Sequence, residues 1–377
     1  MVTERLTTIP RRAAWAEIRL QTLAQNLKNI RKTLQKNVNV MAVVKANAYG
    51  HGAIECSRVL LESGASMLGV ALLQEAIELR TAGISAPILV MTPPLPEEAD
   101  TYISNEIDFT LCKQETAELF SARAEALGKT VAAHVKIDTG MGRVGILPVD
   151  ALEFVRFVDT LPNIRMQGIA THYASSDEDL PYTATQLHSF TSIVKELEQN
   201  GFSFPIRHSA NSGAILNLAE SHLNCVRPGV ILYGYMPSQN MRSNVTLEPV
   251  LSLKAKVDFV KRVPVGTSIS YGRTFFTDME TTIATVPLGY ADGYSRLLSG
   301  KAHAIVNGKK FPVVGRVCMD QIMVDVGNEP VEEGDVLTLI GRDGTETITA
   351  WDIANAMGTI PYEVLTMISS RIPRIFI

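Results

Sequence analysis

Residues 38–52 read VNVMAVVKANAYGHG. The continuous apolar run at the start of this segment is typical of a strand that is buried on both faces. Lys45 follows the run directly, although a lysine is rarely buried without a partner because desolvation of its ammonium group is costly. Lys45 therefore either ends the strand at a solvated surface or has a chemical role.

Apolar runs of the same kind recur through the first two thirds of the chain, and amphipathic segments lie between them. The eight apolar runs are residues 38–46, 67–72, 86–91, 107–112, 131–138, 164–173, 205–211 and 225–233. The helical segments are residues 20–34, 74–82, 114–127, 151–160 and 185–200. Because strands buried on both faces alternate with helices, the pattern predicts a parallel sheet, and eight such units predict a TIM (β/α)8 barrel. An open doubly wound sheet is the structural alternative.

The last third of the chain has a different pattern, with alternating strands and tight turns from about residue 247. Residues 303–315, HAIVNGKKFPVVG, contain an Asn307-Gly308 pair of the kind that favours a hairpin. Residues 332–346 repeat this pattern, and residues 350–357 form a predicted helix. The sequence therefore predicts a barrel domain over residues 12–245 and a mostly β domain over residues 246–377, with which residues 1–11 are expected to pack.

The composition indicates a soluble globular protein that acts on a small molecule. Of the 377 residues, 46% are hydrophobic and 20% are charged, and the net charge of -4 provides no electrostatic reason to expect nucleic acid. No segment is long and apolar enough to predict a membrane span, and no signal-peptide pattern follows the N-terminal arginines. The four cysteines lie far apart without a CxxC motif, which indicates a reduced compartment. We therefore expect a cytoplasmic location.

Polar residues end several of the predicted strands, and in a TIM barrel the functional groups gather at these ends. Lys45, Lys136 and His172 lie at the ends of three runs. Near the last two runs, the segments HSANSG and VRPGVILYG contain glycines whose backbone N–H groups can approach an anion, although each segment alone is also typical of an ordinary turn. A strand-end amine opposite such a phosphate cradle suits a Schiff base with a phosphate-bearing aldehyde. The expected cofactor is therefore pyridoxal phosphate.

The lysine segment resembles a motif of the alanine racemase family. Further segments match that family in its own order and over essentially the whole chain, namely VKIDTGMGRVGI, THYASSD, HSANSG, VRPGVILYG, SISYGRTF, PLGYADGY, GRVCMDQIMVDV and IPYEVL. The family combines a TIM-barrel domain that holds pyridoxal phosphate with a C-terminal β domain. The departures are small, since Tyr173 and Gly213 stand where the family commonly has phenylalanine and alanine.

The resemblance implies a two-base mechanism. Lys45 would bind the cofactor and move a proton on one face of the substrate Cα, while Tyr271 would act on the opposite face. Arg227 resembles the residue that faces the pyridine nitrogen of the cofactor, where a guanidinium donates a hydrogen bond without giving up its proton. His172 resembles the residue that supports Arg227.

The same match implies roles for the remaining site residues, and no metal. The cofactor-binding positions are Lys45, Tyr49, His172, Ser212, Arg227, Gly229, Val230 and Tyr362. The substrate-binding positions are Arg143 and Met319, and the supporting positions are Lys136, which is often carbamylated in the family, and Asp320. The positions that line the substrate corridor are Asp177, Tyr290, Arg296, Arg316 and Ile360.

The expected activity is the interconversion of L-alanine and D-alanine, which supplies D-alanine for peptidoglycan. Because the family places Tyr271 and Met319 in the active site of the partner subunit, the resemblance implies a homodimer with shared active sites. Three alternatives are a serine or broader-specificity racemase, a pyridoxal phosphate-dependent decarboxylase on the same scaffold, and a single-barrel protein that binds the cofactor. GRVCMDQIMVDV does not resemble the cysteine-aspartate segment of the decarboxylases, and single-barrel proteins lack a second domain.

Overall fold

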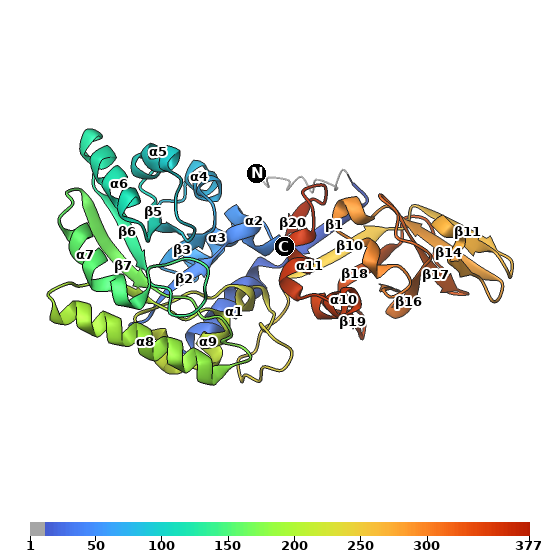
Figure 1. Cartoon of the computed structure of the whole chain (residues 1–377). Helices are drawn as coiled ribbons and strands as arrows, with labels where there is room; N and C mark the ends of the chain where they lie inside the picture. The colour runs from blue at the N-terminus through green and yellow to red at the C-terminus, as the bar shows by residue number, and fades with distance from the viewer. Residues whose placement is uncertain (1–11) are drawn as a thin grey trace, which may run out of the picture. The chain divides into compact units, whose positions relative to one another are not determined.

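The computed structural model describes residues 12–377, and the chain divides into two compact units (Figure 1). The barrel unit contains Thr22–Ala48 and Gly52–Glu248. Among the described residues, the β unit contains residues 12–21, together with Tyr49–His51 and Pro249–Ile377. The expected packing of residues 1–11 lies outside the described part of the chain.

Eight parallel strands close into a barrel in the barrel unit, which confirms the predicted TIM barrel and excludes the open sheet. In the order around the barrel, the strands are β2 (Asn39–Val43), β3 (Met67–Val70), β4 (Ile88–Val90), β5 (Asp108–Leu111), β6 (Val131–Lys136), β7 (Ile164–Ala170), β8 (Ile206–His208) and β9 (Cys225–Val226). Each strand begins within or beside its predicted run. Most strands end earlier than predicted, because apolar residues continue into the loops at the carboxyl ends.

Helices alternate with the barrel strands and lie outside them (Figure 1). The five predicted helices are present as α1 (Leu20–Arg31), α4 (Leu73–Thr81), α6 (Gln114–Ala126), α7 (Ala151–Asp159) and α8 (Leu180–Gln199). The structure adds α3 (Ala53–Glu62), α5 (Ala99–Ser104) and α9 (Ser212–Asn217), which were not predicted. No helix among residues 12–377 is long and apolar enough to span a bilayer.

Side chains from the barrel strands form an apolar cluster and, elsewhere, a polar one. Met41, Met67, Leu89 and Cys225 from four neighbouring strands pack together as a buried hydrophobic cluster. On the other strands, two histidines from β6 and β8 are buried and in contact with each other. Cores of this fold are usually filled by branched apolar side chains, so the buried histidines need a structural or functional reason.

The β unit is built on one large mixed sheet, with β19 (Glu346–Ile348) attached to β18 and with a small separate pair, β12 (Ser268–Ile269) and β13 (Phe275–Phe276). In sheet order the main strands are β11 (Phe259–Val263), β14 (Thr281–Val286), β17 (Ile322–Gly327), β16 (Lys309–Val314), β15 (His303–Val306), β18 (Val336–Asp343), β10 (Leu251–Lys256), β1 (Ala14–Ile18) and β20 (Arg374–Phe376). The predicted mostly β C-terminal domain is confirmed.

Strand β1 belongs to this sheet, although the predicted barrel domain began at residue 12. It pairs antiparallel with β10, where Ala16 lies opposite Leu253, and parallel with β20, where Ala16 lies opposite Arg374. Its backbone N–H and C=O groups therefore pair with a neighbouring strand on each side, and four of its five side chains are buried. An isolated five-residue strand carries no sequence signal for its partner, since β10 lies more than two hundred residues later.

Two local predictions in the β unit are confirmed. Asn307 and Gly308 have φ angles of 51° and 69° and join β15 to β16 in an antiparallel hairpin, as a type I′ turn requires. The predicted helix is α10 (Ala350–Met357), and it is followed by α11 (Pro361–Met367), which the sequence pattern did not indicate.

Candidate active site

The lysine segment leaves the barrel through a left-handed turn. Strand β2 ends at Val43, and α2 (Lys45–Tyr49) has φ angles of 51–53° at all four residues after Lys45. Residues with a Cβ seldom adopt this conformation, which costs roughly 1–2 kcal/mol for each residue. The side chain of Asn47 stabilises the turn by accepting a hydrogen bond from the backbone N–H of Ala53 at 2.8 Å. Lys45 is therefore fixed at the start of a strained turn at the barrel mouth.

Four cationic side chains gather near His172 at this mouth. Burial lowers the pKa of His172 well below its usual value, and Lys136, Arg227, Arg143 and Lys45 lower it further. The imidazole is therefore neutral at neutral pH and can accept a hydrogen bond. So much positive charge at one point fits a ligand that carries phosphate and carboxylate groups.

The amine of Lys45 is shifted toward its neutral form. Burial lowers its pKa most, Arg143 lowers it further, and the carboxylate of Glu75 opposes the shift. Glu75 is held in place because its carboxylate accepts hydrogen bonds from the backbone N–H groups of Ala71 and Leu72 at 2.8 and 3.0 Å. A partly desolvated amine of this kind is a better nucleophile and base at neutral pH than an exposed lysine.

Lys136, at the end of β6, has its pKa lowered still more strongly. Burial is the main cause, and Arg227 and Arg143 add to it, while Asp138 and Cys112 oppose it. Burial and the neighbouring cations thus favour the uncharged form of this amine more than in an exposed lysine. An uncharged amine is the form that reacts with carbon dioxide, and the resulting anion would offset the local positive charge.

Arg227 is held rigidly by hydrogen bonds. Its Nη1 donates to Nδ1 of His208 at 2.9 Å, and its Nη2 donates to the carbonyl oxygens of Thr171 and Ser209, both at 2.9 Å. Nη2 also lies 3.3 Å from Nδ1 of His172. Burial lowers the pKa of Arg227 to about 10, so the guanidinium keeps its charge at neutral pH. His208 was not among the predicted site residues.

Ser212 and Gly229, two residues of the predicted phosphate cradle, are hydrogen-bonded to each other where β8 and β9 end. The hydroxyl oxygen of Ser212 accepts a hydrogen bond from the backbone N–H of Gly229 at 2.9 Å, and Val230 follows at once. Gly213 lies so close to Ser176 that a Cβ added to it would be 2.6 Å from the Ser176 Oγ. A side chain at residue 213 would therefore require Ser176 to shift.

Asp138 organises the loop that carries Arg143. Its carboxylate accepts hydrogen bonds from four successive backbone N–H groups, those of Gly140, Met141, Gly142 and Arg143, at 2.8–3.1 Å. Burial alone would raise the pKa of Asp138, but these hydrogen bonds outweigh it and lower the pKa. The loop is therefore anchored, while the side chain of Arg143 is exposed.

The remaining predicted residues, apart from Asp177, lie in the β unit. The rings of Tyr49 and Tyr362 pack at a centroid distance of 6.0 Å, and Ile360 caps the helix that carries Tyr362. Tyr271 is 70% exposed and begins a short turn. The hydroxyl of Ser270 donates to the carbonyl oxygen of Arg316 at 2.7 Å, which ties this turn to the segment before Met319.

Met319 is supported by the turn that contains Tyr290. The N–H groups of Tyr290 and Ala291 donate to the carbonyl oxygens of Cys318 and Met319, both at 3.0 Å. Ser299, at the end of the turn that begins with Arg296, accepts from the N–H of Val317 at 3.0 Å. The segments that carry Tyr290, Arg296, Arg316 and Met319 are thus joined by hydrogen bonds.

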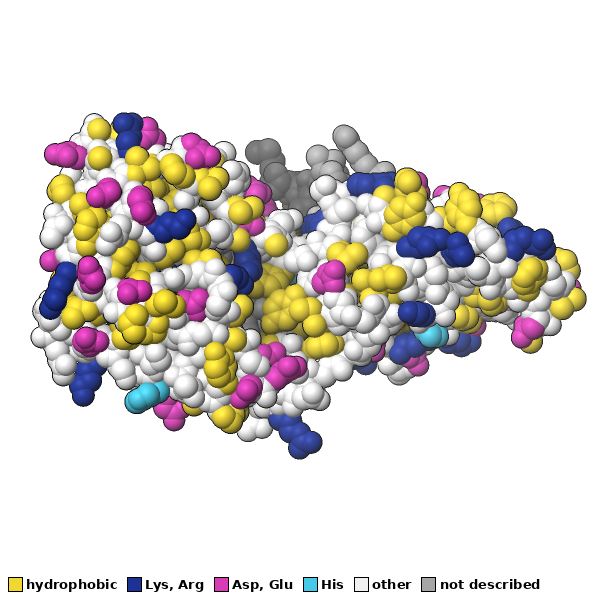
Figure 2. All heavy atoms as spheres, in the orientation of Figure 1, with side chains coloured by type: hydrophobic (Ala, Val, Ile, Leu, Met, Phe, Trp, Pro, Cys, Tyr) yellow, Lys and Arg dark blue, Asp and Glu magenta, His cyan; other side chains and the backbone are white. Residues whose placement is uncertain are grey.

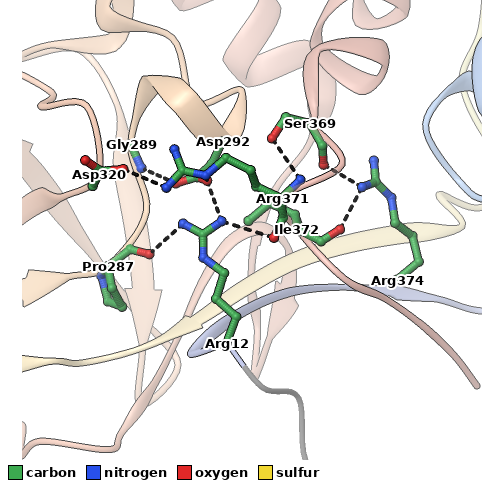
Figure 3. Close-up of polar contacts among 9 residues, drawn as sticks. All are labelled: Arg12, Pro287, Gly289, Asp292, Asp320, Ser369, Arg371, Ile372 and Arg374. Carbon is green, nitrogen blue, oxygen red and sulfur yellow. Dashed lines mark hydrogen bonds and ion pairs between the residues drawn. The ribbon is translucent and has the colours of Figure 1, made fainter.

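An ion cluster around the buried Asp292 secures this turn, and sequence reasoning missed it (Figure 3). The side chain of Asp292 is completely buried, forms ion pairs with Arg12 and Arg371, and accepts a hydrogen bond from the N–H of Gly289 at 3.0 Å. Arg371 also pairs with Asp320 at 2.6 Å. Asp292 lies in PLGYADGY, so the motif was recognised but the carboxylate was not singled out.

The predicted residues therefore form two groups, one in each unit. Lys45, Lys136, Arg143, His172 and Arg227 lie together in the barrel unit with the phosphate cradle, and Asp177 lies beside Gly213. No cluster of three or more histidine, cysteine, aspartate or glutamate side chains suited to a metal occurs among residues 12–377.

Two family profiles match the chain: "Alanine racemase, N-terminal domain" over residues 18–237 and "Alanine racemase, C-terminal domain" over residues 250–376. The chain is 47% identical to an alanine racemase of Methanococcus maripaludis over 367 residues, which are 96% of this chain and 98% of that protein. It is 48% identical to an alanine racemase of Clostridium perfringens over 369 residues, 97% of this chain and 95% of that one.

Solved structures give the same result. The alanine racemase of Clostridium difficile 630 superposes with a TM-score of 0.93 at 39% identity and covers 98% of this chain and 96% of that one. A Bacillus anthracis alanine racemase with bound L-Ala-P has a TM-score of 0.92 at 39% identity, covering 97% and 95%. A histidine racemase from Leuconostoc mesenteroides subsp. sake has a TM-score of 0.91 at 30% identity, covering 98% and 99%.

Proposed function

This chain belongs to the alanine racemase family of pyridoxal phosphate-dependent isomerases, and we propose that it interconverts L- and D-alanine with Lys45 and Tyr271 as its acid/base pair. The observation that carries the proposal is the position of Lys45. Its amine is partly desolvated, has a lowered pKa, and lies among cations that suit an anionic cofactor.

The residues at the barrel mouth fit the cofactor. When bound, pyridoxal phosphate withdraws electrons from the substrate Cα and so acidifies its proton. The neutral amine of Lys45 then takes or returns that proton on one face, and the phenol of Tyr271 serves the other face. Arg227, held by four acceptors, donates a hydrogen bond toward the pyridine nitrogen but keeps its own proton. His172, which is neutral, holds Arg227 in this orientation.

The phosphate would be held by the cradle. Ser212, Gly229 and Val230 supply a hydroxyl and backbone N–H groups, and Tyr49 and Tyr362 supply phenol groups from a pair of packed rings. Burial raises the pKa of Tyr49, so its hydroxyl stays a donor.

The substrate carboxylate would meet Arg143 and the backbone of Met319. We assign Lys136 a carbamate, because burial and neighbouring cations favour its uncharged amine and the same cations would stabilise the anion. The carbamate would orient Arg143. A 13C NMR resonance from protein equilibrated with labelled bicarbonate, lost in Lys136→Ala, would support this assignment, and its absence at saturating bicarbonate would contradict it.

Two supporting features complete the site. Asp320 would help to fix Met319 through its ion pair with Arg371. The entrance would be lined by Asp177, Tyr290, Arg296, Arg316 and Ile360. All but Asp177 lie in the β unit.

We further propose a homodimer in which Tyr271 and Met319 complete the site of the partner subunit. Tyr271 and Met319 are 70% and 53% exposed within their own chain, which is unusual for residues proposed to touch a substrate. Hydrophobic side chains also gather on the visible surface of the β unit (Figure 2). Exposed apolar patches of this kind mark interaction surfaces.

The substrate range needs its own test, because the histidine racemase has the same fold. A broader-specificity racemase is therefore the second candidate. The β unit excludes the single-barrel alternative. A cytoplasmic location and a role in peptidoglycan supply are consistent with four cysteines that form no disulfide bond and with alanine as substrate.

The proposal is tested by incubating purified protein with a panel of L-amino acids, with and without added pyridoxal phosphate, and measuring the D-enantiomers. We expect D-alanine as the main product and no product from Lys45→Ala, which should also lack the absorbance of lysine-bound cofactor. Lys113→Ala is the matched control, because Lys113 lies just beyond the end of β5 but is exposed. If another amino acid is racemised faster than alanine, that amino acid is the preferred substrate and the proposal for alanine is wrong.

A further inference from the structure

A line of polar side chains connects Arg227 to the opposite end of the barrel. Arg227 follows β9, His208 is the last residue of β8, His134 lies within β6, and Asp108 is the first residue of β5. Nη1 of Arg227 is 2.9 Å from Nδ1 of His208, and Nε2 of His208 is 2.9 Å from Nδ1 of His134. Nε2 of His134 is 3.5 Å from a carboxylate oxygen of Asp108.

While all of these contacts are kept, the chemistry of the four groups allows one arrangement of protons. A guanidinium only donates, so Nδ1 of His208 must accept and the proton of this imidazole must be on Nε2. That N–H donates to Nδ1 of His134, whose own proton must then be on Nε2, facing Asp108. Burial, followed by Arg227 and His134, lowers the pKa of His208 well below its usual value, which agrees with a neutral ring.

The barrel makes specific room for His134. Gly168 on β7 lies opposite His134 in the strand register, next to a register shift between Ala133 and His134. A Cβ at Gly168 would be 2.2 Å from Nδ1 of His134, too close for any side chain. His134 itself is 1% exposed, and its buried Nε2 has no hydrogen-bond partner within the described chain. The nearest counter-charge to this N–H is therefore Asp108.

We propose that His134 and Asp108 are positioning residues for Arg227. Asp108 keeps the proton of His134 on Nε2, which leaves Nδ1 of His134 free to accept from Nε2 of His208. The proton of His208 is then on Nε2, and its Nδ1 can accept a hydrogen bond from Arg227. Without this order, a protonated Nδ1 of His208 would face the guanidinium and repel it. The inference rests on the proposed role of Arg227 toward the pyridine nitrogen. The carboxylate of Asp108 also acts on Arg80, whose pKa it raises.

The direct test is to determine the tautomers of both rings. Protein with 15N-labelled histidine, loaded and free of cofactor, would be examined by long-range 1H–15N correlation NMR at neutral pH. We expect His134 and His208 to carry the proton on Nε2. In Asp108→Ala we expect a mixture of tautomers at both rings, while Asp108→Asn, which keeps an acceptor oxygen, should change them less. A proton on Nδ1 of His208 in the unmodified protein would overturn the inference.

Steady-state kinetics provide the second readout. Asp108→Asn should lower kcat by about fivefold with little change in KM, since coupling through such networks is modest and the substrate contacts are untouched. The absorbance of the bound cofactor should shift in the same variant. Asp100→Asn is the matched control, because Asp100 is an exposed aspartate of the same barrel unit and pairs with Arg123. This variant should leave kcat and the absorbance of the bound cofactor unchanged.

The outcomes separate this inference from the proposed function. Unchanged tautomers, cofactor absorbance and kcat in both Asp108 variants would overturn it. Tautomers that respond to Asp108 in a protein that fails to racemise alanine would support the order of protons but refute the proposed activity. If Asp108→Ala does not fold, Asp108→Asn provides the same comparison with the shape of the side chain retained.

Discussion

At the scale of single residues, Lys45 depends on two neighbours of opposite charge. Arg143 disfavours the ammonium form and lowers the pKa of Lys45, whereas Glu75 favours the ammonium form and raises it. The amine that reacts with the cofactor is the uncharged form. The two neighbours therefore set, in opposite directions, the pH at which Lys45 becomes reactive.

Substitution of these neighbours should move the pH dependence of cofactor uptake in opposite directions. Removing the positive charge in Arg143→Gln raises the pKa of Lys45. The midpoint of the pH dependence of cofactor uptake therefore moves to higher pH, and uptake at neutral pH slows. Removing the negative charge in Glu75→Gln lowers the pKa and moves the midpoint down. The rate is measured by stopped-flow absorbance when cofactor-free protein is mixed with pyridoxal phosphate.

Glu78→Gln is the control for this experiment, because Glu78 lies on the same helix as Glu75 but is exposed. It should leave the midpoint unchanged. A shift in the same direction for Arg143→Gln and Glu75→Gln would contradict the electrostatic explanation.

Tyr271 carries a second prediction at this scale. Tyr271→Phe removes the phenol proton but keeps the ring, so it should slow exchange of the Cα proton far more from one enantiomer of alanine than from the other. Loss of a general acid or base typically costs 10²–10⁴-fold, and we expect about 100-fold on the affected side. NMR in deuterium oxide, started from each pure enantiomer, measures both rates. Equal losses would count against two separate bases.

At the scale of elements, the left-handed turn after β2 holds Lys45 under strain. Ala46 is exposed and has a φ of 51°, which a glycine adopts at no steric cost. Glycine at this position keeps the backbone N–H that donates to Glu75. The strain can therefore be measured by one substitution.

Ala46→Gly should stabilise the protein, because it relieves roughly 1–2 kcal/mol of strain and adds about 0.5–1 kcal/mol of chain entropy to the unfolded state. We expect a net gain of about 0.5–1 kcal/mol. Ala184→Gly is the matched control: Ala184 is an exposed residue within α8, where the same change should destabilise by about 1 kcal/mol. The thermal unfolding midpoint should rise in Ala46→Gly and fall in Ala184→Gly. A lower midpoint for Ala46→Gly would contradict the inference that the turn is strained.

Prediction from sequence was most successful for elements with a local pattern. The eight barrel strands, α10 and the hairpin at Asn307 each have a local periodicity or turn residue. The left-handed turn has no such signal, because alanine and tyrosine ordinarily avoid positive φ. Gly213 at the site is not marked by a local pattern either. The space for a side chain there is limited by Ser176, which is 37 positions away in the sequence and adjacent only after folding.

The site itself was predictable in part because its motifs are contiguous. The motifs identified Lys45, Arg227 and Ser212, whose roles follow from resemblance. They did not identify His134, Asp108 or Asp292, because these residues act through contacts between distant segments. A buried polar group is recognised from its partners, and partners of this kind become visible only in three dimensions.

At the scale of the whole molecule, the proposed site draws its residues from both units. Lys45 lies in the barrel unit and Tyr271 in the β unit. If each active site combines Lys45 of one subunit with Tyr271 of the other, neither subunit can be active alone. Two defective variants should then restore one another.

Lys45→Ala and Tyr271→Ala should each be inactive, but their mixture should regain activity after dissociation and reassembly. In a mixed dimer, one site receives both substitutions and the other receives none. Half of the dimers are mixed if assembly is random, so activity should reach about a quarter of the unmodified level. The assay is D-alanine formation after remixing, and mixtures that stay inactive while mixed dimers form would show that the sites are not shared.

Strand β1 has a consequence for the order in which the chain can fold. It lies between β10 and β20 in the sheet, so the first described strand pairs with the last one of the chain. The barrel is in effect an insertion within the β domain. During translation the barrel can form while β1 has no partner, and the sheet closes only after the final residues leave the ribosome. A fragment that begins at Pro249 would lack this inner strand, so the two domains can be separated only if residues 12–21 stay with the sheet.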